Sequence, residues 1–184
     1  MRTEATPLPG VLIVHPEIFR DTRGLFLETW RRDRFEAAGI SATFVQDNQS
    51  RSAGGTLRGL HWQWRRPQAK LVRVLSGRIY DVVVDVRRGS PHFGHWFGLT
   101  MDGDDFTSLY VPVGFAHGFC VLSDSADVVY KCSEAYDPGG EAGLIWNDPL
   151  VAIEWPVASP ILSPRDRQHP RLDPARADPL SYSR

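Results

Sequence analysis

Short apolar runs recur along the chain, and glycine, proline or clusters of polar residues separate them. Runs of this kind, rich in valine, leucine and aromatic residues, are typical of β-strands. We expect strands over residues 10–14, 25–30, 44–48, 56–63, 70–75, 78–86, 94–99, 108–111, 115–122 and 127–136, with a loop over 50–55. A spacing of roughly 8 to 12 residues, without βαβ alternation, predicts an all-β sandwich or barrel with Greek-key or jelly-roll connections.

Two segments depart from this pattern. Residues 31–39 predict one short helix, because Phe35 and Ala38 share a face, charges fill the other face and Gly39 ends the run. From Asp148 onward prolines recur, so we expect an irregular segment that wraps around the barrel. Beyond Leu172 the composition predicts a mobile tail.

The clearest hairpin prediction joins residues 70–75 to 78–86 through Ser76 and Gly77. In the second of these strands the side chains alternate between two faces. One face carries Asp81, Val83 and Asp85, and the other carries Val82, Val84 and Val86. Two carboxylates should therefore point the same way.

Length and charge narrow the possible classes of protein. A chain of 184 residues fits one domain, and a domain of this size buries roughly 70% of the surface of its unfolded chain. The net charge of −1 comes from interspersed acids and bases, which gives no reason to expect a nucleic-acid or membrane partner. No secretory signal or long apolar segment is evident, so we expect a cytoplasmic protein. Cys120 and Cys132 lie in apolar runs and are expected to be buried free thiols.

Polar groups interrupt one predicted strand in an unusual way. Arg58, His61 and Gln63 alternate with the apolar and aromatic residues of this strand. In a regular strand Arg58 and His61 would point to opposite faces, because their positions differ in parity. Gly59 could provide a bulge that brings both side chains to one side. The stretch therefore predicts the floor of a polar site.

Metal binding finds weak support among the histidines. His61 is followed two positions later by Gln63 instead of a second imidazole, and only His117 returns from a later strand. His92 and His95 flank a turn and are expected at the surface. We therefore predict no metal site, and a metal-dependent cupin remains an alternative.

Proton transfer fits the same residues better. It needs a base, an acid on the other side of the substrate and cations that stabilise an enolate. His61 could be the base and Tyr130 the acid, while Lys70 and Arg58 could carry the oxyanion. Taken singly, Tyr130 could be an ordinary buried tyrosine, Lys70 an edge lysine and His117 a core histidine.

Several ordered motifs make the chain similar to a known family. These are Arg58-Gly59-Leu60-His61, Lys70-Leu71-Val72, Gly114-Phe115-Ala116-His117-Gly118-Phe119, Tyr130-Lys131, Trp146-Asn147-Asp148-Pro149, Trp155-Pro156 and Leu162-Ser163-Pro164-Arg165-Asp166, preceded by Asp21-Thr22-Arg23-Gly24 and Phe44-Val45-Gln46-Asp47-Asn48. From about residue 10 to 172 the chain resembles the dTDP-4-dehydrorhamnose 3,5-epimerase family.

The resemblance implies a cupin jelly roll without metal or cofactor, usually a homodimer that shares N-terminal strands. Its implied substrate is a dTDP-linked 4-keto-6-deoxyhexose. By this likeness His61 is the base, oriented by Asp166, and Tyr130 is the acid that reprotonates the opposite face. Lys70 and Arg58 would polarise the C4 oxygen, with His117 and Asp81 as a supporting pair. Further residues would line the nucleotide-sugar site, some of them from the partner subunit: Arg23, Phe26, Glu28, Gln46, Asn48, Tyr136 and Arg165.

The resemblance leaves some functional questions open. The chain between His61 and Lys70 is one residue shorter than usual for the family, so either the loop is tighter or Lys70 is displaced. Enzymes that epimerise only C3 or only C5 carry similar motifs. A sugar-binding cupin module without catalysis is a further alternative, although it would need no acid facing a base.

Overall fold

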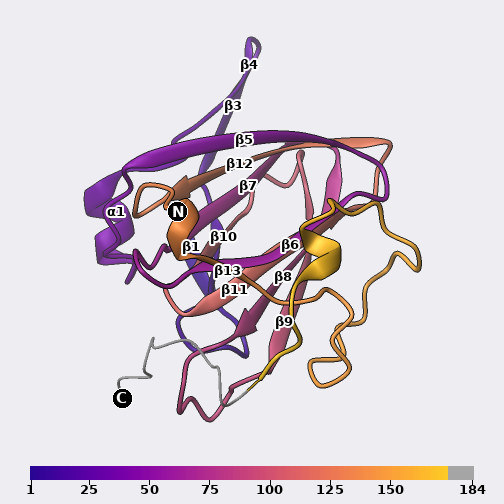
Figure 1. The fold of residues 1–184 in the computed structure, drawn as a ribbon. Coiled ribbons are helices and arrows are strands. Elements are labelled where there is room, and N and C mark those ends of the chain that lie inside the picture. Colours follow the sequence, from indigo (N-terminus) through magenta and orange to yellow (C-terminus); the bar gives the residue numbers. More distant parts are fainter. Residues whose placement is uncertain (174–184) are drawn as a thin grey trace.

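The computed structural model describes residues 1–173, and the strands it contains form two main sheets and a separate hairpin (Figure 1). The first sheet has the order β1-β2-β10-β7-β12-β5. Its strands are β1 (Arg2–Ala5), β2 (Leu12–His15), β10 (Ser108–Val111), β7 (Lys70–Ser76), β12 (Ser125–Cys132) and β5 (Gln46–Ala53).

The second sheet has the order β13-β6-β11-β8-β9. Its strands are β13 (Glu141–Gly143), β6 (Leu57–Gln63), β11 (Phe115–Val121), β8 (Arg78–Asp85) and β9 (Trp96–Asp102). All pairings in the two sheets are antiparallel. The predicted all-β jelly-roll class is confirmed.

A core fills the space between the sheets. Val72, Val74 and Val128 of the first sheet pack there with Ile79 and Val83 of the second. On the outer side of the second sheet, a separate apolar cluster joins the strands to the C-terminal wrap, through Val82, Val84, Ala116, Leu144 and Val151. The alternation predicted for residues 81–86 therefore sorts side chains between the central core and the wrap.

The helices are short. Helix α1 (Arg32–Ala37) confirms the predicted helix and packs Phe35 with Val14 and Leu71. Two 3₁₀ helices, η1 (Pro138–Gly140) and η2 (Asp166–Gln168), lie near the second sheet, η2 in the irregular wrap. In the part of the chain that the structure describes, no helix has the length and apolar character needed to cross a membrane.

The predicted hairpin between residues 70–75 and 78–86 is wrong. Strands β7 and β8 belong to different sheets, and the chain crosses from one sheet to the other at Gly77. Gly77 has φ +78°, and a Cβ there would lie 2.1 Å from the carbonyl oxygen of Ser125. Both strands send apolar side chains into the core between the sheets, and an apolar pattern alone does not distinguish that arrangement from side-by-side pairing.

The predicted loop over residues 50–55 is also wrong in its first part. Strand β5 continues to Ala53 and pairs with β12 along its whole length. The polar sequence of β5 lacks the apolar pattern by which strands are predicted. An edge strand pairs its backbone on only one side and tolerates polar side chains. The strand predicted to reach residue 136 ends at Cys132.

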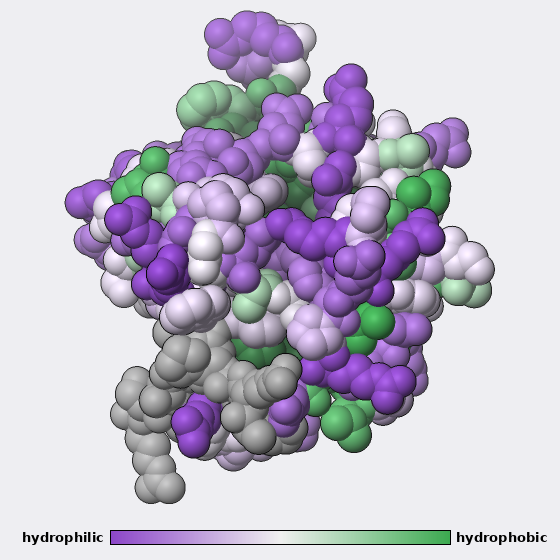
Figure 2. Space-filling view, in the orientation of Figure 1, coloured by the Kyte–Doolittle hydropathy of each residue, from purple (hydrophilic) through white to green (hydrophobic). Residues whose placement is uncertain are grey.

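The remaining strands, β3 (Ile18–Asp21) and β4 (Gly24–Leu27), form a hairpin that projects from the body of the molecule (Figure 1). Hydrophilic residues cover most of the face shown in Figure 2, and hydrophobic ones appear there in small separate patches. Cys120 and Cys132 are buried and free, as predicted. The tail predicted beyond residue 172 falls almost wholly outside the described residues.

Candidate active site

A cavity of about 320 Å³ opens among the two sheets and the C-terminal wrap. Ligand pockets in proteins commonly have volumes of about 300–1,000 Å³. The residues that line it are Gln46, Asn48, Ser50, Arg58, His61, Trp62, Gln63, Gln68, Lys70, His117, Phe119, Tyr130, Tyr136, Glu141, Ser163, Arg165 and Asp166. Every predicted catalytic residue is among them, so the structure brings these side chains together.

The bulge predicted at Gly59 is present. Across the β6–β11 ladder His61 lies opposite His117, and Arg58 lies opposite Phe119. From Arg58 to His61 strand β6 advances by three residues, while the paired strand β11 advances by only two. The extra residue is a bulge, and it turns the side chains of Arg58 and His61 to the same side of the sheet. Gly59 has φ +119°, and a Cβ there would lie 2.6 Å from Cα of Gly118. Close strand approach and a positive φ both require glycine at this position.

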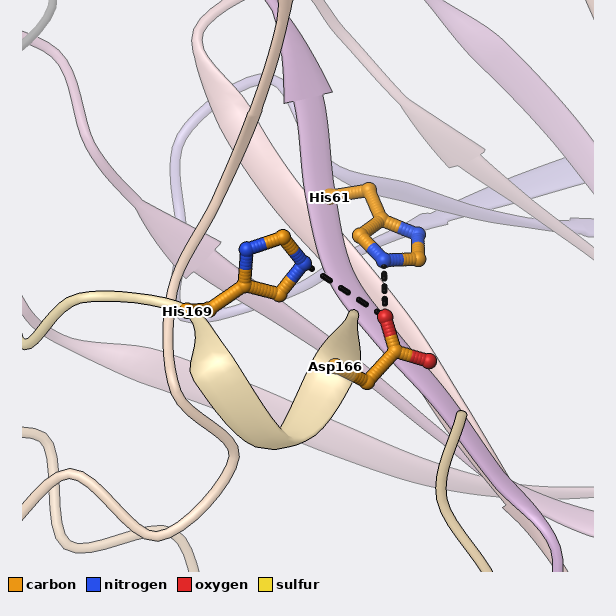
Figure 3. Close-up of side chains that lie close together, drawn as sticks. All are labelled: His61, Asp166 and His169. Atoms are coloured by element: carbon orange, nitrogen blue, oxygen red, sulfur yellow. Dashed lines mark hydrogen bonds and ion pairs between the residues drawn. The ribbon is translucent and has the colours of Figure 1, made fainter. Parts of the chain in front are cut away.

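His61 and Asp166 form a hydrogen-bonded pair. Nε2 of His61 lies 2.6 Å from Oδ1 of Asp166, and the carboxylate comes from η2 in the wrap (Figure 3). Burial tends to raise the pKa of Asp166, but interactions with His169 and His61 outweigh it and hold that pKa well below its usual range. An ionised carboxylate can only accept a hydrogen bond, so Nε2 of His61 carries the proton and Nδ1 keeps its lone pair.

Burial determines the protonation of the groups around this pair. It lowers the pKa of His61, and the nearby Asp166 carboxylate opposes that shift only in part. A neutral imidazole with a free nitrogen is the form that can accept a proton. Burial also raises the pKa of Tyr130, so its phenol keeps its proton at neutral pH.

Two cationic side chains border the cavity. Lys70 begins β7, and burial lowers its pKa. It lies in the cavity wall, so the short connection from His61 does not remove Lys70 from the site. Arg58 donates from Nε to Oγ of Ser52 at 2.8 Å, which fixes its guanidinium beside the cavity.

His117 and Asp81 form the predicted supporting pair. Nε2 of His117 lies 2.9 Å from both carboxylate oxygens of Asp81, and both residues are buried. The pair comes from β11 and β8, next to β6 in the same sheet. It therefore lies beside His61, which is the cross-strand partner of His117.

A polar network forms one wall of the cavity. Tyr136 donates from its hydroxyl to Glu141 at 2.8 Å, and Arg165 also donates to Glu141. The backbone N–H of Tyr136 donates to Oε1 of Gln46, whose Nε2 donates to Asn48. Four predicted binding residues therefore meet here. Glu141 was missed, because it lies in a three-residue strand that no sequence pattern announces.

Three predicted binding residues lie away from this cavity. Arg23 forms an ion pair with Asp21 in the projecting hairpin, and the side chain of Phe26 there is 69% exposed. Glu28 forms ion pairs with Arg31 and Arg34 near α1. None of the three belongs to the cavity wall that a single described chain provides.

His61, Asp166 and His169 together offer three atoms that could hold a metal, all within 4.8 Å of one another. Two atoms that bind one tetrahedral zinc at about 2.0–2.1 Å lie about 3.3 Å apart. The 2.6 Å between His61 and Asp166 is instead a hydrogen-bond distance. The geometry of these residues fits a proton-transfer pair better than a metal centre.

Comparisons with known proteins identify relatives of this chain. The family model of dTDP-4-dehydrorhamnose 3,5-epimerase matches residues 5–174. A dTDP-4-dehydrorhamnose 3,5-epimerase of Neisseria gonorrhoeae is 51% identical over 162 residues, which cover 88% of this chain and 49% of that protein. The chain thus spans about half the length of that relative.

Two solved structures extend the comparison. A dTDP-6-deoxy-D-glucose-3,5-epimerase of Legionella pneumophila, in complex with dTDP-4-keto-L-rhamnose, superposes with a TM-score of 0.94 at 43% identity, covering 100% of this chain and 99% of that one. A 3'-monoepimerase of Streptomyces bikiniensis, in complex with dTDP-quinovose, has a TM-score of 0.86 at 36% identity, covering 94% and 87%. The chain belongs to the dTDP-4-dehydrorhamnose 3,5-epimerase family.

Proposed function

We propose that this chain epimerises dTDP-4-dehydro-6-deoxy-D-glucose at C3 and C5, giving dTDP-4-dehydro-L-rhamnose. Family membership and the likeness to the Legionella enzyme with its bound dTDP-sugar support this substrate. The observation that carries the proposal is the His61–Asp166 pair in one cavity with Tyr130. A base and a phenol on different sheets can act on opposite faces of one sugar ring.

The mechanism follows from the acidity of protons next to a ketone. Nδ1 of His61 takes a proton from the carbon beside the C4 keto group, and the electron pair moves to the C4 oxygen as an enolate. Asp166 stabilises the imidazolium that results, while Lys70 and Arg58 stabilise the oxyanion. Tyr130 then gives its proton to the opposite face of the same carbon, which inverts the centre. Proton exchange with water restores both residues for the second carbon.

We also propose that the active unit is a homodimer. The projecting β3–β4 hairpin exposes Phe19, Leu25 and Phe26, with 52%, 41% and 69% of their surfaces accessible. Exposed apolar residues on a projecting element are typical of a protein interface. If the hairpin reaches the partner's cavity, Arg23 and Phe26 would act there as the resemblance implies. Light scattering should then give twice the chain mass, and Phe26→Ala should raise KM for the nucleotide sugar.

A mono-epimerase is the second candidate. The likeness to the Streptomyces 3'-monoepimerase favours it, because that fold holds a dTDP-sugar as well. The base and the acid are needed whether one carbon reacts or two. The choice depends on how the sugar ring turns between steps, which a static cavity does not fix. The cytoplasmic location and the lack of a cofactor expected from the sequence stay predictions.

Incubation with dTDP-4-keto-6-deoxyglucose in heavy water tests the proposal. NMR then locates deuterium on the sugar, and a downstream reductase traps the inverted product. Label at both C3 and C5 is the expected result. Label at one carbon would establish the mono-epimerase, and no label would favour the binding module.

A further inference from the structure

His169 is a half-buried titratable residue that the mechanism does not use. It follows η2 directly, and 12% of its side-chain surface is accessible. Its Nε2 lies 3.4 Å from Oδ1 of Asp166, the same oxygen that contacts His61 (Figure 3). That nitrogen is buried, and within the described part of the chain its contact with Asp166 lacks hydrogen-bond geometry, although it still helps to lower the pKa of that carboxyl group. Two imidazoles thus point at one carboxylate oxygen, and only one of them is well bonded to it.

Packing holds the His169 ring in this position. A Cβ built on Gly143 would lie 2.2 Å from Cε1 of His169, so the ring covers the glycine directly. Gly143 is the cross-strand partner of His61. On either side, Asp166 N–H donates to Ser163 Oγ at 3.0 Å, and Ile145 N–H donates to the carbonyl of Pro170 at 2.9 Å. The wrap is therefore fixed before and after His169.

We propose that His169 is a positioning residue for the His61–Asp166 pair, which shares the Asp166 carboxylate with His61 and thereby limits the basicity of His61. The inference rests on the proposed function, in which His61 is the base. His169 itself lies outside the wall of the substrate cavity. It borders a separate hollow together with Glu141, Arg171 and Asp173. Among the described residues, these three charged groups share the hollow with His169, and Asp166 and His61 contact its ring.

The sign of the effect follows from two contributions. An N–H group directed at Asp166 draws charge away from His61, and the His169 ring keeps water from the pair. Removal of His169 leaves the full carboxylate charge for His61 and admits water. Each change favours the imidazolium form of His61 and raises its pKa. A merely structural role would lower the rate without moving this titration.

Two substitutions separate the donor from the ring. His169→Phe keeps an aromatic ring over Gly143 and removes the N–H, whereas His169→Gln keeps a donor and removes the ring. Long-range ¹H–¹⁵N NMR of the free protein reports the titration and tautomer of His61 without any substrate. We expect His169→Phe to raise the titration midpoint of His61 by roughly half a unit to one unit, and His169→Gln to shift it less. The acid limb of the pH profile of the exchange rate in heavy water should move to higher pH together with this midpoint.

Gly143→Ala is a second way to disturb the contact between His169 and Asp166, and it leaves His169 itself unchanged. Gly143 is not among the residues with positive φ, so alanine does not strain the backbone there, and the three atoms nearest to the added methyl group all belong to the His169 ring. We expect the single variant to displace His169 and to shift the His61 titration upward. In the Gly143→Ala/His169→Ala double variant, the shift should equal that of His169→Ala alone, a non-additive result.

The outcomes separate this inference from the proposed function. An unchanged His61 midpoint in folded His169→Phe and in folded Gly143→Ala would overturn the inference, even if wild-type exchange is normal. If these substitutions shift the His61 midpoint but the protein without them incorporates no label, the coupling is supported and the proposed epimerase activity is overturned. Circular dichroism and thermal unfolding identify the variants that are folded. A downward shift would contradict the inference as well.

Discussion

Oδ1 of Asp166 lies 2.6 Å from Nε2 of His61, although 105 residues separate the two in the chain. One residue belongs to a strand of the second sheet, and the other to a 3₁₀ turn in the irregular wrap. In the proposed mechanism the barrel supplies the base and the wrap supplies its orienting group. Activity should therefore depend on a segment that adds little regular secondary structure.

Replacement of His61 by alanine should abolish proton exchange without unfolding the protein. His61 is partly accessible at the cavity wall, so its loss leaves no large hole in the core. General-base removal typically costs about 10²- to 10⁴-fold in rate. Deuterium incorporation is the measurement, and His92→Ala, outside the cavity wall, is the matched control. Full activity in His61→Ala would exclude the mechanism.

Replacement of Asp166 by asparagine should lower the rate and also change its pH dependence. The carboxylate raises the pKa of His61, so its loss lowers that pKa further. The acid limb of the rate profile should then move to lower pH, opposite to the shift expected for His169→Phe. The rate should fall about 10- to 100-fold, because a charged hydrogen bond contributes about 1.5–3 kcal/mol. A profile that moves upward would contradict this role for Asp166.

Replacement of Tyr130 by phenylalanine should separate the two proton transfers. The ring keeps its packing, since Tyr130 lies against the core between the sheets. Abstraction by His61 continues, while protonation of the opposite face loses its donor. Exchange of the sugar proton for deuterium with retained configuration should persist, and the rate of formation of inverted product should fall about 10²-fold or more. If exchange and inversion decline equally, Tyr130 acts through packing.

Replacement of Gly59 by alanine should destabilise the protein more than the same change at Gly24. Both glycines have positive φ, at +119° and +127°, so both substitutions strain the backbone. Only Gly59 also brings a Cβ within 2.6 Å of a neighbouring strand, whereas Gly24 has nothing within 4 Å. Urea unfolding should show an additional loss of about 1–3 kcal/mol at Gly59. Equal losses would mean that the strands adjust freely.

The sequence predicted the positions of the strands in this fold better than it predicted which strands pair with each other. Short apolar runs and glycine turns located most strands, and the parity of Arg58 and His61 predicted the bulge at Gly59. The pairing of residues 70–86 was wrong, because apolar alternation is the same for a hairpin and for a crossing between sheets. The distinction depends on contacts of Gly77 with β12, which are distant in sequence.

The site was predictable where chemistry and motif coincided. The ordered motifs contain four titratable side chains that could transfer or stabilise a proton or charge. The structure gathers all four in one cavity: His61, Lys70, Tyr130 and Asp166. Glu141 and His169 lie in segments without periodicity, so no sequence signal identified them. Arg23, Phe26 and Glu28 lie outside the cavity wall of one described chain, and their role stays a prediction.

The crossing of the wrap over the second sheet also sets an order of events during synthesis. His61 leaves the ribosome 105 residues ahead of Asp166, and every strand of the two sheets precedes Asp166 in the described sequence. A nascent chain can therefore assemble both sheets and most of the cavity while its base still lacks an orienting carboxylate. If the proposed mechanism holds, catalytic competence arrives with the closing segment, and a product that ends just before residue 166 would keep the strands of both sheets but lack the carboxylate that orients its base.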